Sequence, residues 1–430
     1  MTDTFALKGN ICYSESKTNI KTVHGYAVCS GGLSRGAYET LPEEFAAVPV
    51  YDFGDSLISP AMVDLHIHAP QYTFRGTGMD YELMQWLRNV AFPEEERYAD
   101  SEYARRAYSV FADGLRRGAT GRACIFATVH RRATEILMEE MEKSGVISLV
   151  GKVNMDRGAP EKIIESAQDS AEETVRWLEA VNGRFSRTEP ILTPRFLPGC
   201  TDELMRRLGM IRRKYDLPVQ SHLSENPEEA ELVGRLYPQA KFYGDGYDRY
   251  GMLGDGETRG TSVRTVMAHC VWSDRREVGR LYENGVFVAH CPGSNLNLSS
   301  GIAPVRKYLD AGIRVGLGTD VAAGHSDSIF RAMTDAIQVS KMYWRYVDKE
   351  ATPLKFEEAF WMATRGGGEF FGRVGGFDTG YAFDALVVDD TSLRSPQRLP
   401  VSRRLERAVY LSLDITGGIK AKFVAGERIF

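Results

Sequence analysis

The fold prediction for this chain of 430 residues depends on the segment VDLHIH, residues 63–68. The segment places His66 and His68 one residue apart, at the end of an apolar run that is typical of a buried strand. On a strand, residues two apart point to the same face. Both imidazoles can therefore face one metal ion, and imidazole is the commonest metal ligand among side chains. A lone His-x-His pair is weak evidence, because such pairs also occur by chance, so the interpretation depends on the rest of the chain.

Three more candidate residues stand at the ends of short apolar runs: His222 in VQSHLSEN, His269 in TVMAHC and Asp320 in VGLGTD. In a barrel of alternating strands and helices, the strand ends meet at one rim, and that rim carries the chemistry of the fold. Three imidazoles and one carboxylate can bind one zinc ion and leave a position for water. Each histidine alone is more often structural, but the joint placement of all five residues favours a catalytic metal.

Short apolar runs alternate with segments of helical period between residues 61 and 325, as in repeated units of a strand and a helix. Eight runs are predicted to be strands, which is the number in a (β/α)8 barrel of the TIM type. They are residues 61–66, 119–127, 146–153, 190–195, 218–223, 263–269, 286–290 and 313–318. Residues 101–117 are predicted to form a helix that ends at Gly118, because apolar residues recur there every three or four positions. This stripe comprises Tyr103, Ala107, Val110, Phe111 and Leu115.

The two ends of the chain differ from the middle. Residues 1–60 are rich in Val, Thr, Tyr, Ser and Gly, and residues 383–430 contain the β-like runs FDALVV and IKAKFVAGERIF. We therefore predict an α/β protein in which residues 61–374 form a metal-dependent hydrolase barrel of the (β/α)8 type. Residues 1–60 and 375–430 are predicted to form a small composite β-sandwich domain. The turn-rich stretch 242–260 lies between the fifth and sixth predicted strands, where it can border the mouth of the pocket.

Composition excludes several classes of function. The chain is 43% hydrophobic and 26% charged, with a formal net charge of −5, which is ordinary for a globular protein. Asp and Glu (58) outnumber Lys and Arg (53), and no long basic run indicates a nucleic-acid partner. We see no signal peptide and no apolar stretch near the roughly 20 residues of a membrane span. The six cysteines include no CxxC pair, so we expect reduced thiols in a cytoplasmic protein that acts on a small molecule.

Glu225 is the candidate general acid and base. It lies three residues after His222 in HLSE, so both side chains can face one pocket across a strand-to-helix turn. The alternative is a glutamate that only balances a helix dipole, because Asn226 and Pro227 are helix-start signals. His290 and Asn295 in AHCPGSN are predicted to support the site.

Several motifs, in their order along the chain, resemble those of the guanine deaminases of the amidohydrolase superfamily: VDLHIHAPQY, TPRF, SHLSEN, MAH, HCPGSNLNLSSG and GLGTD. The resemblance covers roughly residues 60–325. It implies one zinc ion held by His66, His68, His222 and Asp320. It also implies that His269 positions the water or the tetrahedral intermediate, that Glu225 shuttles protons, and that Asp320 helps to deprotonate the water. The run TPRF offers no lysine for carboxylation, which is similar to the one-metal members of the superfamily.

The resemblance also implies a set of substrate contacts. Gln71 and Arg195 would hydrogen-bond a purine, Phe196 would lie against its ring, and Trp86 and His222 would line the pocket. A guanidinium only donates, so Arg195 suits the carbonyl of guanine, whereas the amino group of adenine would stay unpaired. Alternatives stay open: Arg195 as a structural ion-pair residue, Phe196 as core, and Trp86 as helix packing. After TPRF the chain reads LPGC, where the family pattern has a serine-rich segment.

The activity that the resemblance implies is zinc-dependent hydrolysis of guanine to xanthine and ammonia in purine catabolism, by a hydrolase that acts on C–N bonds of cyclic amidines. The nearest alternative is a related aminohydrolase that acts on 8-oxoguanine, a pterin or a triazine. A two-metal amide hydrolase is disfavoured by the missing lysine, and a non-enzymatic scaffold by the complete ligand set. Family members are often dimers, so a homodimer is expected.

Overall fold

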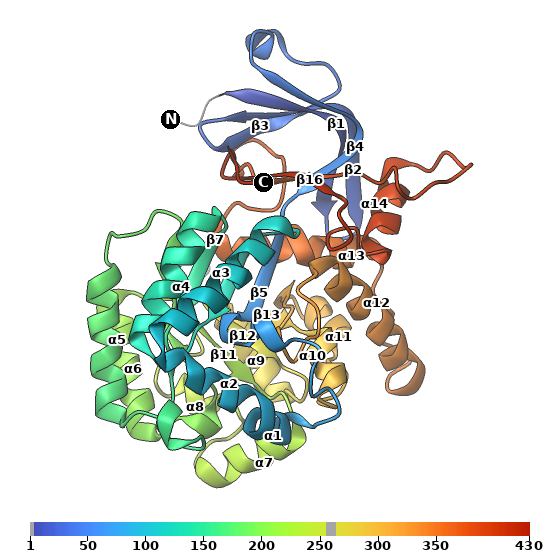
Figure 1. Ribbon diagram of the computed structural model, residues 1–430. Helices are drawn as coiled ribbons and strands as arrows, with labels where there is room; N and C mark the ends of the chain where they lie inside the picture. The colour runs from blue at the N-terminus through green and yellow to red at the C-terminus, as the bar shows by residue number, and fades with distance from the viewer. Residues whose placement is uncertain (1–3, 255–263) are drawn as a thin grey trace.

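The computed structural model describes residues 4–254 and 264–430. It has two parts, which Figure 1 shows one above the other: a barrel of strands and helices, and a smaller β unit that contains both ends of the chain. Strand β5 runs from the small unit into the barrel, so the His-x-His segment lies on the connection between the two parts.

The barrel strands form two parallel sheets, in the orders β5-β6-β7-β9 and β11-β12-β13-β14. A bridge between Leu192 and Val219 joins the two sheets on one side. On the other side, the Asp320 N–H donates to the His66 carbonyl oxygen at 2.8 Å and the His68 N–H donates to the Val321 carbonyl oxygen at 3.1 Å. The strands are β5 (Met62–His68), β6 (Thr120–Phe126), β7 (Ile147–Gly151), β9 (Thr188–Pro190), β11 (Val219–Leu223), β12 (Thr265–His269), β13 (Phe287–His290) and β14 (Arg314–Leu317). The predicted barrel is confirmed, since each of the eight predicted strands has a counterpart in the described chain.

The predicted strand 190–195 differs in detail. It is divided into β9, which ends at Pro190, and β10 (Thr193–Pro194), which pairs with the short strand β8 (Val153–Asn154). Proline has no N–H to donate to a sheet, so a run with Pro190 and Pro194 cannot make a continuous ladder. The interruption leaves the carbonyl of Arg195 free to serve the site described below.

Helix α3 (Ser101–Arg117) has the predicted boundaries, and Gly118 follows its last residue. The Asp100 side chain caps it by accepting from the Glu102 and Tyr103 N–H groups. One residue of the predicted stripe is wrong: Val110 is 56% exposed. The buried face instead includes Ala104 and Tyr108, because residues at intervals of three and four align along one side of a helix. This face comprises Ala104, Ala107, Tyr108, Phe111, Ala112 and Leu115.

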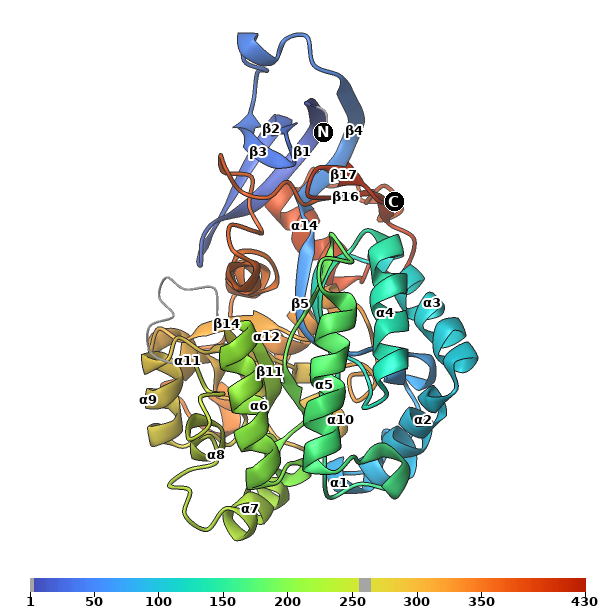
Figure 2. The ribbon, with the colours of Figure 1, turned by 90° about the vertical axis from the view of Figure 1, so that its left-hand side faces the viewer.

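Helices surround the barrel, and Figure 2 shows α5 and α6 standing side by side on its outer face. The longer helices are α4 (Arg131–Ser144), α5 (Ala167–Val181), α6 (Asp202–Tyr215), α7 (Pro227–Leu236), α9 (Arg275–Glu283), α12 (Ile329–Tyr346) and α14 (Val401–Tyr410). The shorter ones are α1 (Leu83–Trp86), α2 (Phe92–Glu96), α8 (Asp245–Asp248), α10 (Pro292–Asn297), α11 (Val305–Asp310) and α13 (Phe356–Trp361). Within the described parts of the chain, no helix has the length and hydropathy to cross a membrane.

The two chain ends share one sheet of seven strands in the order β17-β16-β15-β4-β1-β2-β3, where we expected a sandwich. Strand β4 joins the ends, because it pairs parallel with β1 and antiparallel with β15. The strands are β1 (Phe5–Ser16), β2 (Asn19–Ser30), β3 (Leu33–Tyr38), β4 (Val50–Pro60), β15 (Ala385–Val388), β16 (Ile419–Val424) and β17 (Glu427–Arg428). The domain boundaries at residues 60/61 and 374/375 stay a prediction.

Two buried polar contacts fasten this sheet to the barrel. The Arg122 guanidinium on β6 donates to Asp384, with the Nε–Oδ2 distance at 2.6 Å. Lys422 on β16 is fully buried, and its ammonium donates to three carbonyl oxygens, those of Leu115, Gly118 and Thr120, at 2.6–2.9 Å. The end of the chain is therefore tied to the first barrel helix through groups that are out of contact with water.

We predict that Lys422→Met lowers the free energy of unfolding by about 2 kcal/mol, because three buried carbonyls lose their donor and an unsatisfied buried group costs about 1–3 kcal/mol. The matched control is Lys420→Met, on the same strand but with its side chain 53% exposed. It should change stability by less than about 0.5 kcal/mol. Denaturant unfolding measures both variants, and equal effects of the two substitutions would contradict this account of the junction.

Candidate metal and purine site

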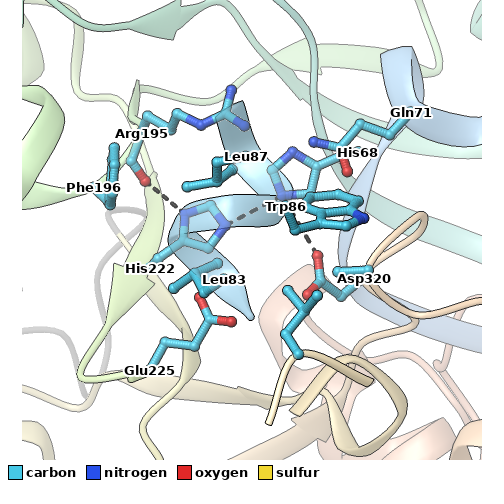
Figure 3. Close-up of a pocket in the computed structure, with 12 residues that line it drawn as sticks. His68, Gln71, Leu83, Trp86, Leu87, Arg195, Phe196, His222, Glu225 and Asp320 are labelled. Atoms are coloured by element: carbon cyan, nitrogen blue, oxygen red, sulfur yellow. Dashed lines mark hydrogen bonds and ion pairs between the residues drawn. The ribbon is translucent and has the colours of Figure 1, made fainter. Parts of the chain in front are cut away.

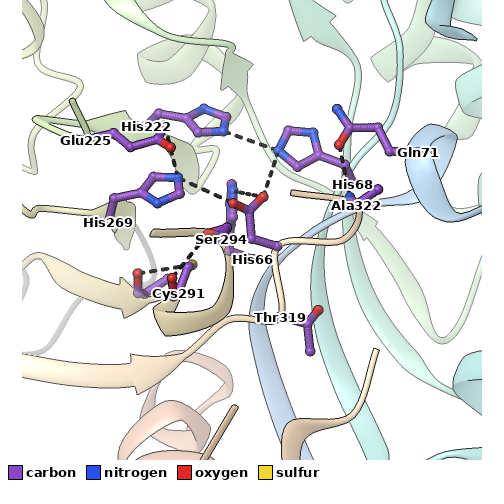
Figure 4. Close-up of polar contacts among 12 residues, drawn as sticks. His66, His68, Gln71, His222, Glu225, His269, Cys291, Ser294, Thr319 and Ala322 are labelled. Carbon is purple, nitrogen blue, oxygen red and sulfur yellow. Dashed lines mark hydrogen bonds and ion pairs between the residues drawn. The ribbon is translucent and has the colours of Figure 1, made fainter. Parts of the chain in front are cut away.

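The strand ends bring the predicted residues together at one rim of the barrel (Figures 3 and 4). His68 Nε2 lies 3.2 Å from His222 Nε2, and Asp320 Oδ1 lies 3.2 Å from His66 Nε2 and 3.5 Å from His68 Nε2. The potential ligand atoms of these four residues all lie within 4.8 Å of one another. His269 Nε2 lies beside them, 3.7 Å from Asp320 Oδ2.

Hydrogen bonds behind the site fix the orientation of these groups. The His222 Nδ1–H donates to the Arg195 carbonyl oxygen at 2.6 Å, so its Nε2 presents a lone pair to the centre. The Asp64 carboxylate accepts from the backbone N–H of His66 and from both the N–H and the hydroxyl of Thr319. Asp64 thereby joins the first strand to the residue before Asp320. Sequence analysis did not identify Asp64, although it lies inside VDLHIH.

The electrostatics suit metal binding. Burial lowers the pKa of His66, and lowers that of His68 and His222 still further, which favours the neutral form of imidazole that binds a metal ion. Burial opposes ionisation of Asp320, but the surrounding imidazoles, His66 above all, outweigh it and lower its pKa to about 2. The result is a buried set of three nitrogen donors and one anionic oxygen. His66 Nε2 has no hydrogen-bond partner among the described residues, as expected of a nitrogen that serves a metal ion.

A second group, His269, Cys291 and Asp320, also lies close enough to hold an ion. Burial raises the pKa of the Cys291 thiol well above its ordinary value. This group offers three ligands, whereas the group of His66, His68, His222 and Asp320 offers four, the number that zinc prefers. The four-residue group is therefore the better metal site of the two.

Two of the functional positions have an uncommon backbone conformation. His269 and Asp320 have φ angles of 73° and 49°, in the left-handed region that residues other than glycine rarely adopt. Such conformations persist where the surrounding structure enforces them, and they concentrate at active sites. Here the turn at the end of each strand aims a polar side chain into the barrel mouth instead of along the strand.

Glu225 lies beside the metal ligands and faces the pocket. Its Oε2 lies 3.4 Å from His269 Nε2, and its Oε1 accepts from the Ser300 hydroxyl at 3.2 Å. Burial, assisted by the charge of Asp320, raises the pKa of Glu225 to about 8, close to the value that suits a general acid and base near neutral pH. The helix-start role belongs to other residues, because Asn226 and Glu229 form the capping box of α7.

His269 is oriented by Asn295, whose side-chain oxygen accepts from its Nδ1–H at 2.9 Å. This contact leaves His269 Nε2 directed at Glu225 and Asp320, 3.4 Å and 3.7 Å from their carboxylate oxygens, without a hydrogen-bond partner among the described residues. Asn295 therefore occupies the supporting position that was predicted for it. His290 is also buried nearby, but both of its ring nitrogens lack a hydrogen-bond partner in the described chain.

A pocket opens over this centre, and Figure 3 shows it between the metal ligands and the α1 segment. Trp86 lies in its wall, and its indole N–H has no hydrogen-bond partner among the described residues. Leu83 and Leu87, which sequence analysis did not identify, lie in the same wall because they share a helical face with Trp86. The lining comprises His68, Gln71, Leu83, Trp86, Leu87, Arg195, Phe196, His222, Glu225, Leu298, Asp320 and Ala323.

Arg195 both lines the pocket and forms an ion pair, so the ion-pair alternative is confirmed and its contact with a purine stays a prediction. Its terminal nitrogens contact the two carboxylate oxygens of Glu95 at 2.5 and 3.0 Å. Gln71 Nε2 donates to the same carboxylate at 2.9 Å. Glu95 was missed because it lies in FPEEER, an acidic run that resembles an ordinary exposed helix end. No local spacing distinguishes it from Glu94 and Glu96.

The described part of the turn-rich stretch, residues 242–254, is placed differently from the expectation. Residues 245–248 form α8, and none of residues 242–254 lines the pocket. Tyr247 from this stretch is buried behind β11, where its hydroxyl donates to the His222 carbonyl oxygen at 2.8 Å. Residues 255–260 lie outside the described chain. The part that is described supports the fifth strand instead of bordering the mouth. Cys200, in the run LPGC, is buried, and none of the six cysteines forms a disulfide.

Comparison with known proteins agrees with this geometry. Residues 57–427 match the model of the amidohydrolase family. A guanine deaminase from Dictyostelium discoideum is 38% identical over 351 residues, which cover 81% of this chain and 76% of that protein. A mouse guanine deaminase is 39% identical over 343 residues, covering 78% and 73%. The crystal structure of guanine deaminase from C. acetobutylicum with bound guanine has 40% identity and a TM-score of 0.95, with both chains covered completely.

We predict one tightly bound divalent ion per chain, because the site offers four ligands and no bridging group. Elemental analysis of the purified protein measures this number. Asp320→Ala and His222→Ala should lose most of the bound metal, whereas His325→Ala, an exposed histidine that contacts Asn297, should retain it. Two equivalents per chain, or full metal content in the Asp320 variant, would contradict the assignment.

Proposed function

Because this chain belongs to the amidohydrolase family, we propose that it is a guanine deaminase, a hydrolase that converts guanine and water to xanthine and ammonia. One observation carries this proposal: a single buried pocket combines a metal-ligand set, a carboxyl group with a raised pKa, and an arginine with a glutamine in its wall. The first two can activate water, and the last two can recognise an oxopurine.

The metal would be held by His66, His68, His222 and Asp320, and the donor set of three nitrogens and one oxygen favours zinc. A bound zinc ion supplies Lewis acidity, which lowers the pKa of a water molecule and helps it to act as a nucleophile near neutral pH. Hydrogen bonds to Asp64 and to the Arg195 carbonyl keep these ligands in place before any ion arrives.

Substrate recognition is assigned to Arg195, Gln71 and Phe196, which form the recognition wall of the pocket. Arg195 would donate to the guanine carbonyl and Gln71 would bond the neighbouring ring edge, while Phe196 lies against the purine face. The free indole N–H of Trp86 offers one further donor. These groups all line the pocket, so the purine would exclude water from the reacting carbon.

Proton transfer is assigned to Glu225, His269 and Asp320. Water adds to C2 of guanine, the carbon that bears the amino group, and its first proton passes through Asp320 and Glu225 to the adjacent ring nitrogen. Glu225 then transfers the remaining hydroxyl proton of the adduct to the amine, so that the C2–N bond breaks, ammonia leaves and the new oxygen becomes a carbonyl. His269, held by Asn295, stabilises the oxygen that adds to the ring. Glu225 is suited to both directions of transfer because its pKa, about 8, lies near the working pH.

We also propose a cellular location, an assembly state and a metabolic role for the protein. We place it in the cytoplasm, where its six unpaired cysteines would stay reduced, and we expect a homodimer without nucleic-acid or membrane partners. The role would be purine catabolism.

Glu225→Gln should reduce the turnover of guanine at least about 100-fold, because the amide keeps the size of the side chain but cannot carry the proton. Metal content should stay at the wild-type value. Xanthine formation and elemental analysis measure the two quantities. The matched control is Glu228→Gln in the first turn of α7, which does not line the pocket and should leave turnover unchanged. Near-normal turnover in Glu225→Gln would move the proton shuttle to another residue.

The substrate range is the sharpest test of the function. A site built to hydrogen-bond a particular substrate group rejects an analogue that lacks it by up to about 10⁴-fold, so adenine and cytosine should release ammonia near background. Guanine should exceed 8-oxoguanine, a pterin and a triazine in kcat/KM when all are measured side by side. A higher kcat/KM for one of these three would overturn the guanine assignment and keep the aminohydrolase mechanism.

A further inference from the structure

We propose that Glu95 is the positioning residue for purine recognition: it holds Arg195 and Gln71 in the orientations that bind the substrate, and it neutralises Arg195. This inference rests on the proposed function and adds a residue that does not itself line the pocket. The Glu95 side chain therefore acts through its two neighbours.

The contacts of Glu95 are convergent. Its Oε1 accepts from both Gln71 Nε2 at 2.9 Å and Arg195 Nη2 at 3.0 Å, and its Oε2 accepts from Arg195 Nη1 at 2.5 Å. Glu95 is 2% exposed and Arg195 is 2% exposed. One buried carboxylate thus contacts both polar side chains that face the purine. Buried charges are retained in proteins when they are paired and hydrogen-bonded in this way.

Gln71 is held at both ends of its amide. Its Nε2 donates to Glu95, and its Oε1 accepts from the Ala322 N–H at 3.1 Å. An amide that is fixed on both sides cannot rotate to exchange its donor and acceptor. Its remaining N–H and lone pair therefore have one orientation in the pocket. Ala322 is two residues after Asp320, so this contact also aligns the recognition wall with the metal ligands.

The ion pair with Glu95 also fixes the direction of the N–H groups of Arg195. A guanidinium has five N–H groups, of which the bidentate ion pair with Glu95 uses two. The remaining three are available to a carbonyl oxygen of the substrate. Without Glu95, the guanidinium would be an unpaired charge in a pocket that also contains Glu225 and Asp320, and their carboxylates would attract it away from the recognition wall.

A π-helical turn in the preceding segment explains why Glu95 lies near the pocket. A π-helical turn, Leu87–Ala91, separates α1 from α2. In an uninterrupted α-helix, with about 100° per residue, Glu95 would lie about 80° around the axis from Leu87. The wider turn absorbs one residue and reduces this angle to about 20°. Leu87 and Glu95 can therefore act on the same pocket. Phe92 of this segment also lies under Arg195, with its ring 5.2 Å from the guanidinium carbon.

The experiment compares Glu95→Gln and Glu95→Ala with a matched control, Asp384→Asn. Asp384 is also a buried carboxylate in a bidentate pair with an arginine, but it lies at the junction with the small sheet. The new amide N–H of Glu95→Gln would face Arg195 Nη1, so two donors would oppose each other. We expect KM for guanine to rise at least about tenfold, the equivalent of one well-placed hydrogen bond. We expect kcat to change much less and metal content to stay constant.

Asp384→Asn should lower stability and leave KM at the wild-type value. If Glu95→Gln and Asp384→Asn both lower stability and neither changes KM, Glu95 is a structural residue and the inference is overturned. Wild-type turnover in the same assay separates the two claims, because a wild type without guanine turnover contradicts the proposed function instead. A crystal structure of Glu95→Ala gives a readout independent of turnover. We expect displaced Arg195 and Gln71 side chains, and unchanged positions would overturn the positioning role.

Discussion

The structure depends on the buried carboxylate of Asp320. Its backbone N–H closes the barrel against His66, and its side chain meets the imidazoles of His66, His68 and His269 at 3.2–3.7 Å. An anion in this position costs free energy unless neighbouring groups compensate it. The imidazoles around Asp320 provide this compensation, and a bound cation would add to it. Asp320 therefore takes part both in the closure of the barrel and in the candidate metal site.

Several side chains of the site are oriented by hydrogen bonds to neighbouring groups. Asn295 orients His269, and the carbonyl of Arg195 orients His222. Glu95 does the same for the recognition wall. Such partners restrict side-chain freedom before substrate arrives, so less conformational entropy is lost on binding. The metal ligands and the recognition residues thus have different supporting partners.

The sequence predicted the features that depend on the spacing of residues along one strand or helix. It did not predict the contacts between residues that lie far apart in the chain. Strand ends with His66, His222 and Asp320 were identifiable because a strand places residues at a known face and the barrel gathers strand ends. Glu95 was not identifiable, since its partner Arg195 lies 100 positions away in sequence and only the fold brings them together. Lys422 was missed for the same reason. Val110 was wrongly assigned to the buried face of its helix, because the spacing of apolar residues does not show where the buried face ends.

The most direct test of the account titrates zinc into metal-free protein and follows xanthine formation from guanine. The site of His66, His68, His222 and Asp320 predicts that activity rises in proportion to added zinc and reaches its maximum at one equivalent per chain. A maximum that requires a second equivalent would contradict the one-metal site. Full activity in the metal-free protein, or no xanthine at any zinc concentration, would contradict the central claim that this barrel is a metal-dependent guanine deaminase.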